Sequence, residues 1–394
     1  MFGYLIAATL ARLADEMTVT TIVLLVLDRT GNTALAGAAV AAYTVPSALS
    51  GPVLGAVLDR LRRRADILVL SGISLAAACT GMSVLVGHGP VVAVVAVMVV
   101  AGAAVPLTAG GYSSLVVSIV PPQRRARSNA SDAAVFSIAA IAGPGLAGLL
   151  SALAGTTVAV LTLAAIAAAG AVCTVPLRRF HGEPGEPRST LAAIRAGFGH
   201  LARTPALRGP TVTTVLGWGS FGALSVALPL WTDELGAGTT AAGFLFTALE
   251  AGDLAITLVV AHRLKPERAG RVVIVSTSLL GVAMGGWLLS HSLTQALVVA
   301  VVAGVAQGLS LPAIFAVRQH NTPATLLGQV SVTGASMKIG GYALGALAGT
   351  ALVPSFGPRG TIAAVACCQL LAAAAGWLLS RGPATTSGKL GEAD

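Results

Sequence analysis

Long apolar runs of membrane-spanning length follow one another along this sequence, and they constrain its fold more than any other feature. The hydrocarbon core of a bilayer is about 30 Å thick, so a helix that crosses it needs about 20 mostly apolar residues. On that basis the sequence contains twelve spans. They lie near 4–27, 33–57, 66–87, 90–119, 132–153, 155–176, 209–231, 239–261, 271–290, 293–317, 328–352 and 358–380. Such a series predicts an all-α membrane protein, because lipid offers no partner for unpaired backbone groups.

The composition makes lipid the main solvent of the chain. Hydrophobic residues make up 55% of it and charged residues 10%, whereas a soluble domain carries about 25% charged residues. The net charge of +9 could indicate nucleic acid, but the basic residues fall in short loops, so we expect no nucleic-acid partner. The four cysteines lack metal-ligand spacing, and no phosphate-loop, zinc-protease or nucleophile-elbow motif occurs. We therefore expect no metal, no cofactor and no ATP-driven step.

The basic residues are distributed unevenly between the two sides of the membrane. If the N-terminus lies inside, twenty of the 24 Lys and Arg residues fall in inner loops and the tail, and only Arg29 and Arg359 fall outside. This count places Arg318 in the last inner loop and Lys389 in the tail. By the positive-inside rule, we expect a multi-pass protein of the bacterial cytoplasmic membrane with both termini in the cytoplasm.

A polar stretch divides the spans into two sets of six. We expect a first bundle over 1–176, a cytoplasmic loop over 177–208, a second bundle over 209–380 and a cytoplasmic tail over 381–394. The halves are weakly alike, since GAVLDRLRRRADILVL before the third span aligns with VVAHRLKPERAGRVVIV before the ninth. Two similar halves around a midplane site are typical of secondary transporters.

The loop between the second and third spans carries the most specific motif. It reads Gly55-Ala-Val-Leu-Asp59-Arg60-Leu-Arg-Arg63-Arg64. This is similar to the loop signature of the major facilitator superfamily, Gly-x-x-x-Asp-Arg-x-Gly-Arg-Arg, with Arg62 in place of the second Gly. The six-plus-six layout resembles that family over nearly the whole chain, in particular its bacterial twelve-helix drug and metabolite exporters. The resemblance implies two pseudo-symmetric six-helix bundles, the major facilitator fold.

The resemblance also implies a conformational latch. In the family, the Asp of the motif caps the cytoplasmic end of a helix in the other half, and the Arg pairs with a nearby acid. Asp59 would then face the start of the eleventh span, and Arg63 would pair with Asp132, the acid available near the inner end of the fifth span. Alternatively, the arginines serve only as a topology signal.

A second motif lies in the fifth span. It reads Ala139-Ala-Ile-Ala-Gly143-Pro144-Gly-Leu-Ala147-Gly148, and it is similar to the family's antiporter signature, Gly-x-x-x-Gly-Pro-x-x-Gly-Gly. Small residues let helices approach closely, and Pro144 removes a backbone hydrogen bond and bends the helix. In the family this motif accompanies export, so it favours export over uptake. The alternative is simple helix packing.

Three ionisable residues, Arg12, Asp15 and Glu16, interrupt the first span. Each costs about 2.5–3.5 kcal/mol at a helix centre on insertion scales, so the three must pair or face a cavity. Residues three and four apart share a helix face, so we expect one acid to neutralise Arg12. Many proton-driven exporters of the family carry an arginine in the fourth span. The corresponding stretch 97–111 has no charge here, which makes Arg12 a candidate for that role.

The eighth and eleventh spans add Glu250, Asp253 and Lys338. Together with the first span, the midplane would hold four carboxylates against two cations. Either some carboxylates carry protons, or a cationic substrate supplies the missing charge. The structural alternative is a set of salt bridges that only fix packing. Lesser candidates are Gln307 and Trp218.

Three functional hypotheses follow. The first is a monomeric antiporter that exports a small amphipathic or cationic molecule in exchange for protons by alternating access. The second is a proton-coupled importer of a nutrient. The third is a membrane enzyme, since Glu250-Ala-Gly-Asp253 superficially resembles the Gly-x-Gly-Asp of intramembrane aspartyl proteases, but the first Gly is absent. We therefore expect a transporter rather than an enzyme. Trp231, near the end of its span, is expected to be an interfacial anchor.

Overall fold

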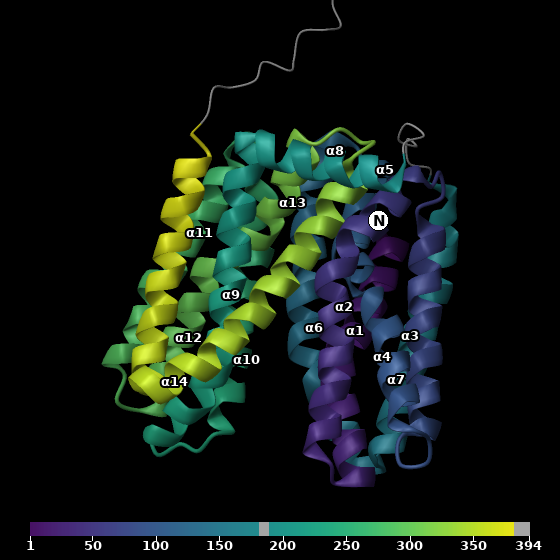
Figure 1. Cartoon of the computed structure of the whole chain (residues 1–394). Helices are drawn as coiled ribbons and strands as arrows, with labels where there is room; N and C mark the ends of the chain where they lie inside the picture. The colour runs from purple at the N-terminus through teal and green to yellow at the C-terminus, as the bar shows by residue number, and fades with distance from the viewer. Residues whose placement is uncertain (181–188, 382–394) are drawn as a thin grey trace, which may run out of the picture.

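The computed structural model describes residues 1–180 and 189–381, and within them every regular element is a helix (Figure 1). The longer helices are α1 (Phe2–Thr30), α2 (Thr33–Arg60), α3 (Ala65–Leu85), α4 (Val91–Ala103), α5 (Tyr112–Ile119), α6 (Arg125–Ala154), α7 (Thr156–Thr174), α8 (Thr190–Arg203), α9 (Pro205–Glu234), α10 (Ala241–Val260), α11 (Pro266–Gly285), α12 (Leu293–Gln307), α13 (Ser310–Asn321) and α14 (Leu327–Leu379). Single turns extend them at η1 (Leu107–Gly111), η2 (Pro122–Arg124), η3 (Val175–Arg179), η4 (Ala261–Arg263) and η5 (Gly286–Leu289). Arg188 of the predicted central loop and Lys389 of the predicted tail lie outside the described residues.

The helices make twelve passes of membrane-spanning length, which confirms the predicted fold class. The fourth pass combines α4, η1 and α5, and the tenth combines α12 and α13. α14 makes the last two passes, because the chain reverses at Gly357, whose φ of 69° is left-handed. Ten helical stretches of the described chain are long and apolar enough to cross a membrane. That set counts α14 once and omits the charged helix α1.

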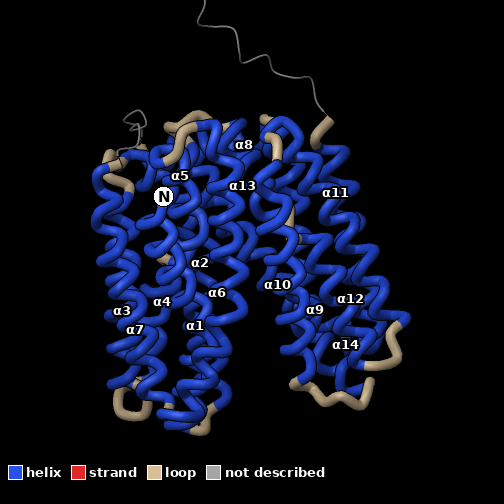
Figure 2. Tube along the Cα trace, turned by 180° about the vertical axis from the view of Figure 1, so that it is seen from behind, coloured by secondary structure: helices blue, strands red, loops and turns tan. Residues whose placement is uncertain are grey.

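The passes form two bundles, α1 to α7 and α9 to α14 (Figure 1). Each bundle has a separate apolar core, centred on residues such as Met17 and Met98 in the first and Leu228 and Met284 in the second. α8, the start of α1 and the end of α14 all lie at one end of the molecule, here called the α8 end. Figure 2 shows that the bundles meet near the α8 end and diverge toward the opposite end, here called the far end.

Small residues let neighbouring passes approach closely, as expected where lipid gives no hydrophobic drive between helices. In the second bundle, a Cβ atom on Gly345 of α14 would overlap the carbonyl of Gly219 in α9. A Cβ atom on Gly222 would overlap the carbonyl of Tyr342 in the same way. In the first bundle, a Cβ atom on Gly102 of α4 would overlap the carbonyl of Tyr43 in α2.

The segment 177–208, which we expect to be a loop, contains the helix α8. Ser189 caps it, since its Oγ accepts a hydrogen bond from the Ala192 amide at 3.3 Å. Gly197 and Leu201 form its buried face. A single amphipathic helix of this length is hard to recognise beside twelve far more apolar spans.

Two polar residues lie deeper in helices than the sequence predicts. α6 begins at Arg125, well before the expected start near 132, so Asp132 lies inside the helix rather than at its end. α13 continues to Asn321, so Arg318 is a buried helical residue and not part of a loop. The apolar runs underestimate helix length wherever a polar turn continues the helix, because such a turn lowers hydropathy without breaking backbone hydrogen bonds.

We predict that Gly345→Ala destabilises the protein by about 1–3 kcal/mol, the usual cost of overpacking a tight contact. The measurement is the melting temperature of the detergent-purified protein. Gly243→Ala is the control, because a Cβ atom there meets nothing within 4 Å and alanine favours a helix by up to about 1 kcal/mol. Equal melting temperatures for the two variants would show that the α9–α14 contact is not tightly packed.

Candidate functional site

Four charged side chains gather where the two bundles meet. They are Glu16 from α1, Glu250 and Asp253 from α10, and Lys338 from α14. The charges of all three carboxylates act on the Lys338 ammonium, and the charge of Glu16 also acts on Glu250. These four residues are called the inter-bundle charge cluster. The sequence predicts them as neighbours, and the structure brings them together.

Asp253 is buried and is held by neutral donors. The Ser137 hydroxyl of α6 donates to it at 2.9 Å, across the boundary between the bundles. The Gln307 amide and the Thr257 hydroxyl lie at the limit of hydrogen bonding, each at 3.5 Å. Within residues 1–180 and 189–381, no basic side chain forms an ion pair with Asp253. Its charge is therefore not neutralised by a direct partner in this conformation.

Lys338 lies against an aromatic wall. Its Nζ is 3.9 Å from the centroid of the Trp218 ring, which packs against Phe221 and Tyr342 at centroid distances of 5.6 and 6.5 Å. A cation over an indole face is stabilised by the ring quadrupole. Trp218, whose role the sequence leaves open, thus positions the cation of the cluster.

Arg12 does not pair with Asp15 or Glu16, so that prediction is wrong. Its Nη1 forms an ion pair with Asp132 of α6 at 2.7 Å, and the two side chains are 1% and 0% exposed. The Tyr4 and Ser113 hydroxyls also donate to Asp132, at 2.6 and 2.7 Å.

The helix geometry explains why the spacing misleads. Side chains on a helix lean toward its N-terminus, so Arg12 reaches away from the acids that follow it. An ion pair along a helix is also weaker when the acid follows the base in the sequence than when it precedes it. The guanidinium carbon instead lies 3.7 Å from the ring centroid of Phe136, and Arg12 is not a counterion of the inter-bundle charge cluster.

The two acids of α1 have different surroundings. Asp15 accepts a hydrogen bond from the Tyr43 hydroxyl of α2, at 2.5 Å. Glu16 lies opposite Gly143, where an added Cβ atom would come within 2.6 Å of the Glu16 Cβ. Gly143, from the antiporter-like motif, therefore lets α6 approach α1 at this acid. Pro144 follows inside α6, while Gly148 faces open space.

Asp59 contacts the start of α14, where the family resemblance places it. Its carboxylate accepts hydrogen bonds from the amides of Gly328 and Gln329, at 2.9 and 2.6 Å. A carboxylate at a helix N-terminus satisfies free amides and interacts favourably with the helix dipole. Gly55 is needed beside it, because a Cβ atom there would lie 2.7 Å from the Gln329 Cα.

The predicted pair between Arg63 and Asp132 is wrong. Asp132 lies inside α6 and is occupied by Arg12. The neighbouring Arg64, rather than Arg63, forms the ion pair of this loop. It pairs with Asp59 at 3.0 Å and donates to the Ala324 carbonyl at 2.9 Å, so it joins the two bundles. Arg60 donates to Thr190 of α8 at 3.1 Å.

Hydrogen bonds between the bundles all lie in the half of the described molecule nearer α8. Asn129 and Gln319 exchange amide hydrogen bonds of 3.0 and 2.9 Å between α6 and α13. Ser336 of α14 donates to the Ser47 carbonyl and accepts from the Gly51 amide of α2, at 2.5 and 2.9 Å. With the Asp59 contacts, these bonds close the α8 end.

Sequence reasoning misses one buried cation and misplaces one tryptophan. Arg318 is 7% exposed, and its hydrogen bond to the Ser331 carbonyl measures 3.5 Å. Its charge acts on Lys338. The signal in the sequence that could have predicted a helical position for Arg318 is that no helix-breaking residue follows it before Pro323. Trp231 is fully buried against Trp287, with ring centroids 6.2 Å apart, so it is not an interfacial anchor.

Comparisons with known sequences agree on one family. The model of the Major Facilitator Superfamily matches residues 4–332 and 211–394. An uncharacterized MFS-type transporter, y4rN of Sinorhizobium fredii, is 30% identical over 367 residues, which cover 90% of this chain and 89% of that protein. The multidrug efflux pump Tap of Mycolicibacterium fortuitum is 28% identical over 384 residues, which cover 93% of this chain and 92% of that protein.

Comparisons with solved structures show the same fold. The human organic anion transporter MFSD10 (TETRAN) superimposes with a TM-score of 0.78 at 18% identity, covering 96% of this chain and 98% of that one. A bacterial homologue of the iron transporter ferroportin, in an outward-facing state, gives a TM-score of 0.74 at 17% identity, covering 97% of this chain and 99% of that one.

We predict that removing one partner of the Arg12–Asp132 pair strongly destabilises the protein. Asp132→Asn or Arg12→Gln leaves an uncompensated buried charge, which costs about 3–5 kcal/mol. The double variant should recover a large part of that loss, because no charge is left unpaired. Melting temperatures of the four purified proteins measure the coupling.

The control for this cycle is the pair of Arg178 and Asp66. It measures 2.6 Å, but its side chains are 43% and 44% exposed. Arg178→Gln should therefore cost less than about 1 kcal/mol. If the loss of stability in the double variant equals the sum of the losses in the two single variants, Arg12 and Asp132 are not energetically coupled.

Proposed function

The chain belongs to the major facilitator superfamily of secondary active, multi-pass membrane transporters, and from that premise we propose that it exports a small amphipathic or cationic molecule in exchange for protons. The observation that carries this proposal is the composition of the inter-bundle charge cluster. It holds three carboxylates from both bundles against Lys338, and the buried Arg318, whose charge also acts on Lys338, leaves one negative charge in excess. Arg12 cannot neutralise the remaining negative charge, because it forms an ion pair with Asp132.

Asp253 of this cluster is buried, and Glu16 and Glu250 are half-buried, so their excess of negative charge favours binding of a mobile species that neutralises it. Burying unpaired charges costs several kcal/mol per ion, so an excess of carboxylates favours binding of protons or of a cationic group. If both bind the same carboxylates, each displaces the other, and the result is exchange. Glu16 on α1 and Asp253 on α10 belong to different bundles, so the bound species also influences how the bundles meet.

Two observations support export rather than import. Gly143 of the antiporter-like motif packs directly on Glu16, which links that motif to an acid of the cluster. The efflux pump Tap is a relative over nearly the whole chain. Uptake of a nutrient together with protons is the competing possibility, and the transport experiment below distinguishes the two.

The positive-inside rule supports placing the α8 end in the cytoplasm, with both termini there and the protein in a bacterial inner membrane. The described conformation is then closed to the cytoplasm, and its bundles diverge toward the outside. Opening the α8 end requires loss of the bonds from Asp59, Asn129, Ser336 and Asp253 to the opposite bundle. We assign Asp59 and Arg64 to the latch that favours this conformation, and we expect a monomer to carry out the cycle.

We predict that Glu250→Gln and Asp253→Asn each lower proton-coupled transport at least about tenfold, equivalent to about 1.4 kcal/mol. The assay is accumulation of a fluorescent organic cation by inverted vesicles that carry a pH gradient. Glu234→Gln, an exposed acid at the far end of α9, is the control and should transport normally. Wild-type transport that persists after collapse of the pH gradient would refute proton coupling, and uptake by right-side-out vesicles would refute export.

We predict that Asp59→Asn opens the α8 end. Asp59 and Arg64 form a buried ion pair, so loss of the carboxylate costs the closed conformation about 3–5 kcal/mol, including the contact with the α14 N-terminus. This shifts the ratio of open to closed molecules by more than about 100-fold. Spin labels on Arg127 of α6 and Arg263 of η4, in a cysteine-free background, report the distance between the bundles at this end.

Asp66→Asn is the matched control for the latch. Asp66 lies just after the same loop, but its partner Arg178 belongs to the same bundle. The distance distribution in this variant should equal that of the wild type. Identical distributions for Asp59→Asn and wild type would show that Asp59 does not hold the closed conformation.

A further inference from the structure

The helix α8 is attached to the elements that close the α8 end. Thr190 at its start accepts a hydrogen bond from Arg60 of α2. Its buried Gly197 faces the Gln329 side chain, which an added Cβ atom would overlap. The His200 ring bonds to the carbonyl of Asn321 at the end of α13, at 2.9 Å. α8 thus contacts both bundles where they join (Figure 1).

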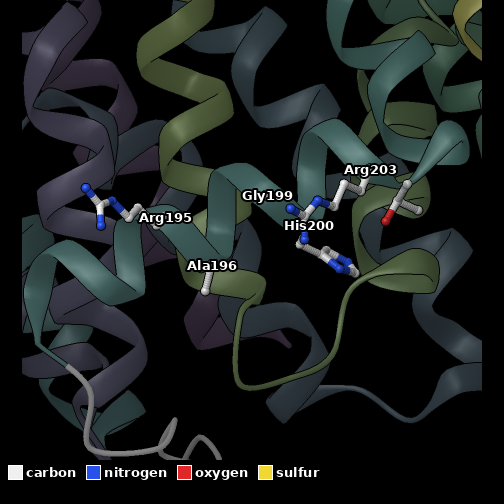
Figure 3. A pocket seen from close by; sticks show the side chains of 6 residues that line it. Arg195, Ala196, Gly199, His200 and Arg203 are labelled. Atoms are coloured by element: carbon white, nitrogen blue, oxygen red, sulfur yellow. The ribbon is translucent and has the colours of Figure 1, made fainter.

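The outer face of α8 carries a basic hollow of about 490 Å³. Its lining residues are Arg195, Ala196, Gly199, His200, Arg203 and Thr204. Figure 3 shows Arg195 at one end of the hollow and His200 with Arg203 at the other. Gly199 lies between them, and an added Cβ atom there would meet only open space.

The charges around this hollow are all of one sign. Arg195 and Arg203 are exposed, and neither forms an ion pair with a carboxylate of the described chain. Their Cα atoms are about 12 Å apart at 1.5 Å per residue along a helix, and both side chains are long enough to reach toward Gly199. Arginine binds phosphate oxygens through paired N–H donors. The hollow is therefore complementary to a phosphate-bearing group.

The same helix also exposes large apolar side chains. Leu191 is 58% exposed and Phe198 is 38% exposed. A helix with apolar side chains beside exposed arginines, at the end of a membrane bundle, matches the pattern of helices that lie in the lipid interface. A soluble anion would leave Leu191 and Phe198 without a partner, whereas a lipid supplies both an anionic headgroup and an apolar body.

We propose that the hollow on α8 binds the headgroup of an anionic glycerophospholipid from the membrane leaflet at that end. The phosphate lies over Gly199 between Arg195 and Arg203. The bound lipid holds α8 against α2, α13 and α14, and it therefore stabilises the conformation that is closed at the α8 end. This site is independent of the transported molecule, because it lies outside the inter-bundle charge cluster.

Binding of phosphatidylglycerol to the detergent-purified full chain tests the proposal, with melting temperature as the readout. Phosphatidylglycerol should raise the melting temperature more than phosphatidylcholine does. The double variant Arg195→Gln/Arg203→Gln should weaken the apparent affinity about 30-fold, since each basic residue near an anionic lipid surface contributes about a fivefold factor. Gly199→Leu keeps both charges but fills the hollow, and it should also abolish the effect.

The control is Arg268→Gln/Arg271→Gln, which removes two exposed charges of α11 at the same end of the molecule. It should retain the response to phosphatidylglycerol. An equal loss in the control would overturn the α8 site in favour of a diffuse surface charge. Full stabilisation by inorganic phosphate or glycerol 3-phosphate alone would overturn the lipid as the ligand, and an undiminished response in Gly199→Leu would exclude the hollow.

Discussion

The ion pair between Arg12 and Asp132 ties α1 to α6 inside the first bundle, and it leaves neither residue free for the exchange site that we propose. Both side chains are almost completely buried, and in such surroundings a charge without a partner is costly. Tyr4 and Ser113 also donate to Asp132, so both oxygens of this carboxylate accept hydrogen bonds. The pair is thus a structural unit, and the cluster between the bundles has Lys338 as its cation.

This division separates two kinds of acidic residue that look alike in the sequence. Asp132 is fixed by a cation and two hydroxyl groups within one bundle. Asp253 is held only by neutral groups, and its shortest bond comes from Ser137 in the other bundle. An acid of the second kind can change its proton or its partner without breaking an ion pair, which an exchange cycle requires.

The sequence predicts the fold well because lipid imposes a simple rule on length and composition. Twelve passes and two bundles follow from apolar runs that cannot fold otherwise. The contact of Asp59 with α14 follows from a local motif whose geometry depends on a few adjacent residues. The partner of Arg12 does not follow, because spacing along one helix shows which residues share a face but not which neighbouring helix competes for them. The sequence does not predict the burial of Arg318 or the helix α8 for a related reason. Hydropathy identifies segments that lie in lipid, but it does not show where a polar segment remains helical.

The contacts that close the α8 end include many bonds between neutral groups, such as the amide pair of Asn129 and Gln319 and the bonds of Ser336 to α2. A neutral hydrogen bond contributes only about 0.5–1.5 kcal/mol net, and water can replace it when the bundles separate. Each bond of such a seal can therefore be exchanged for bonds to water at a small net cost in free energy. The seal is also almost insensitive to ionic strength, because the Asp59–Arg64 pair lies within the first bundle and is buried, where salt screens it little.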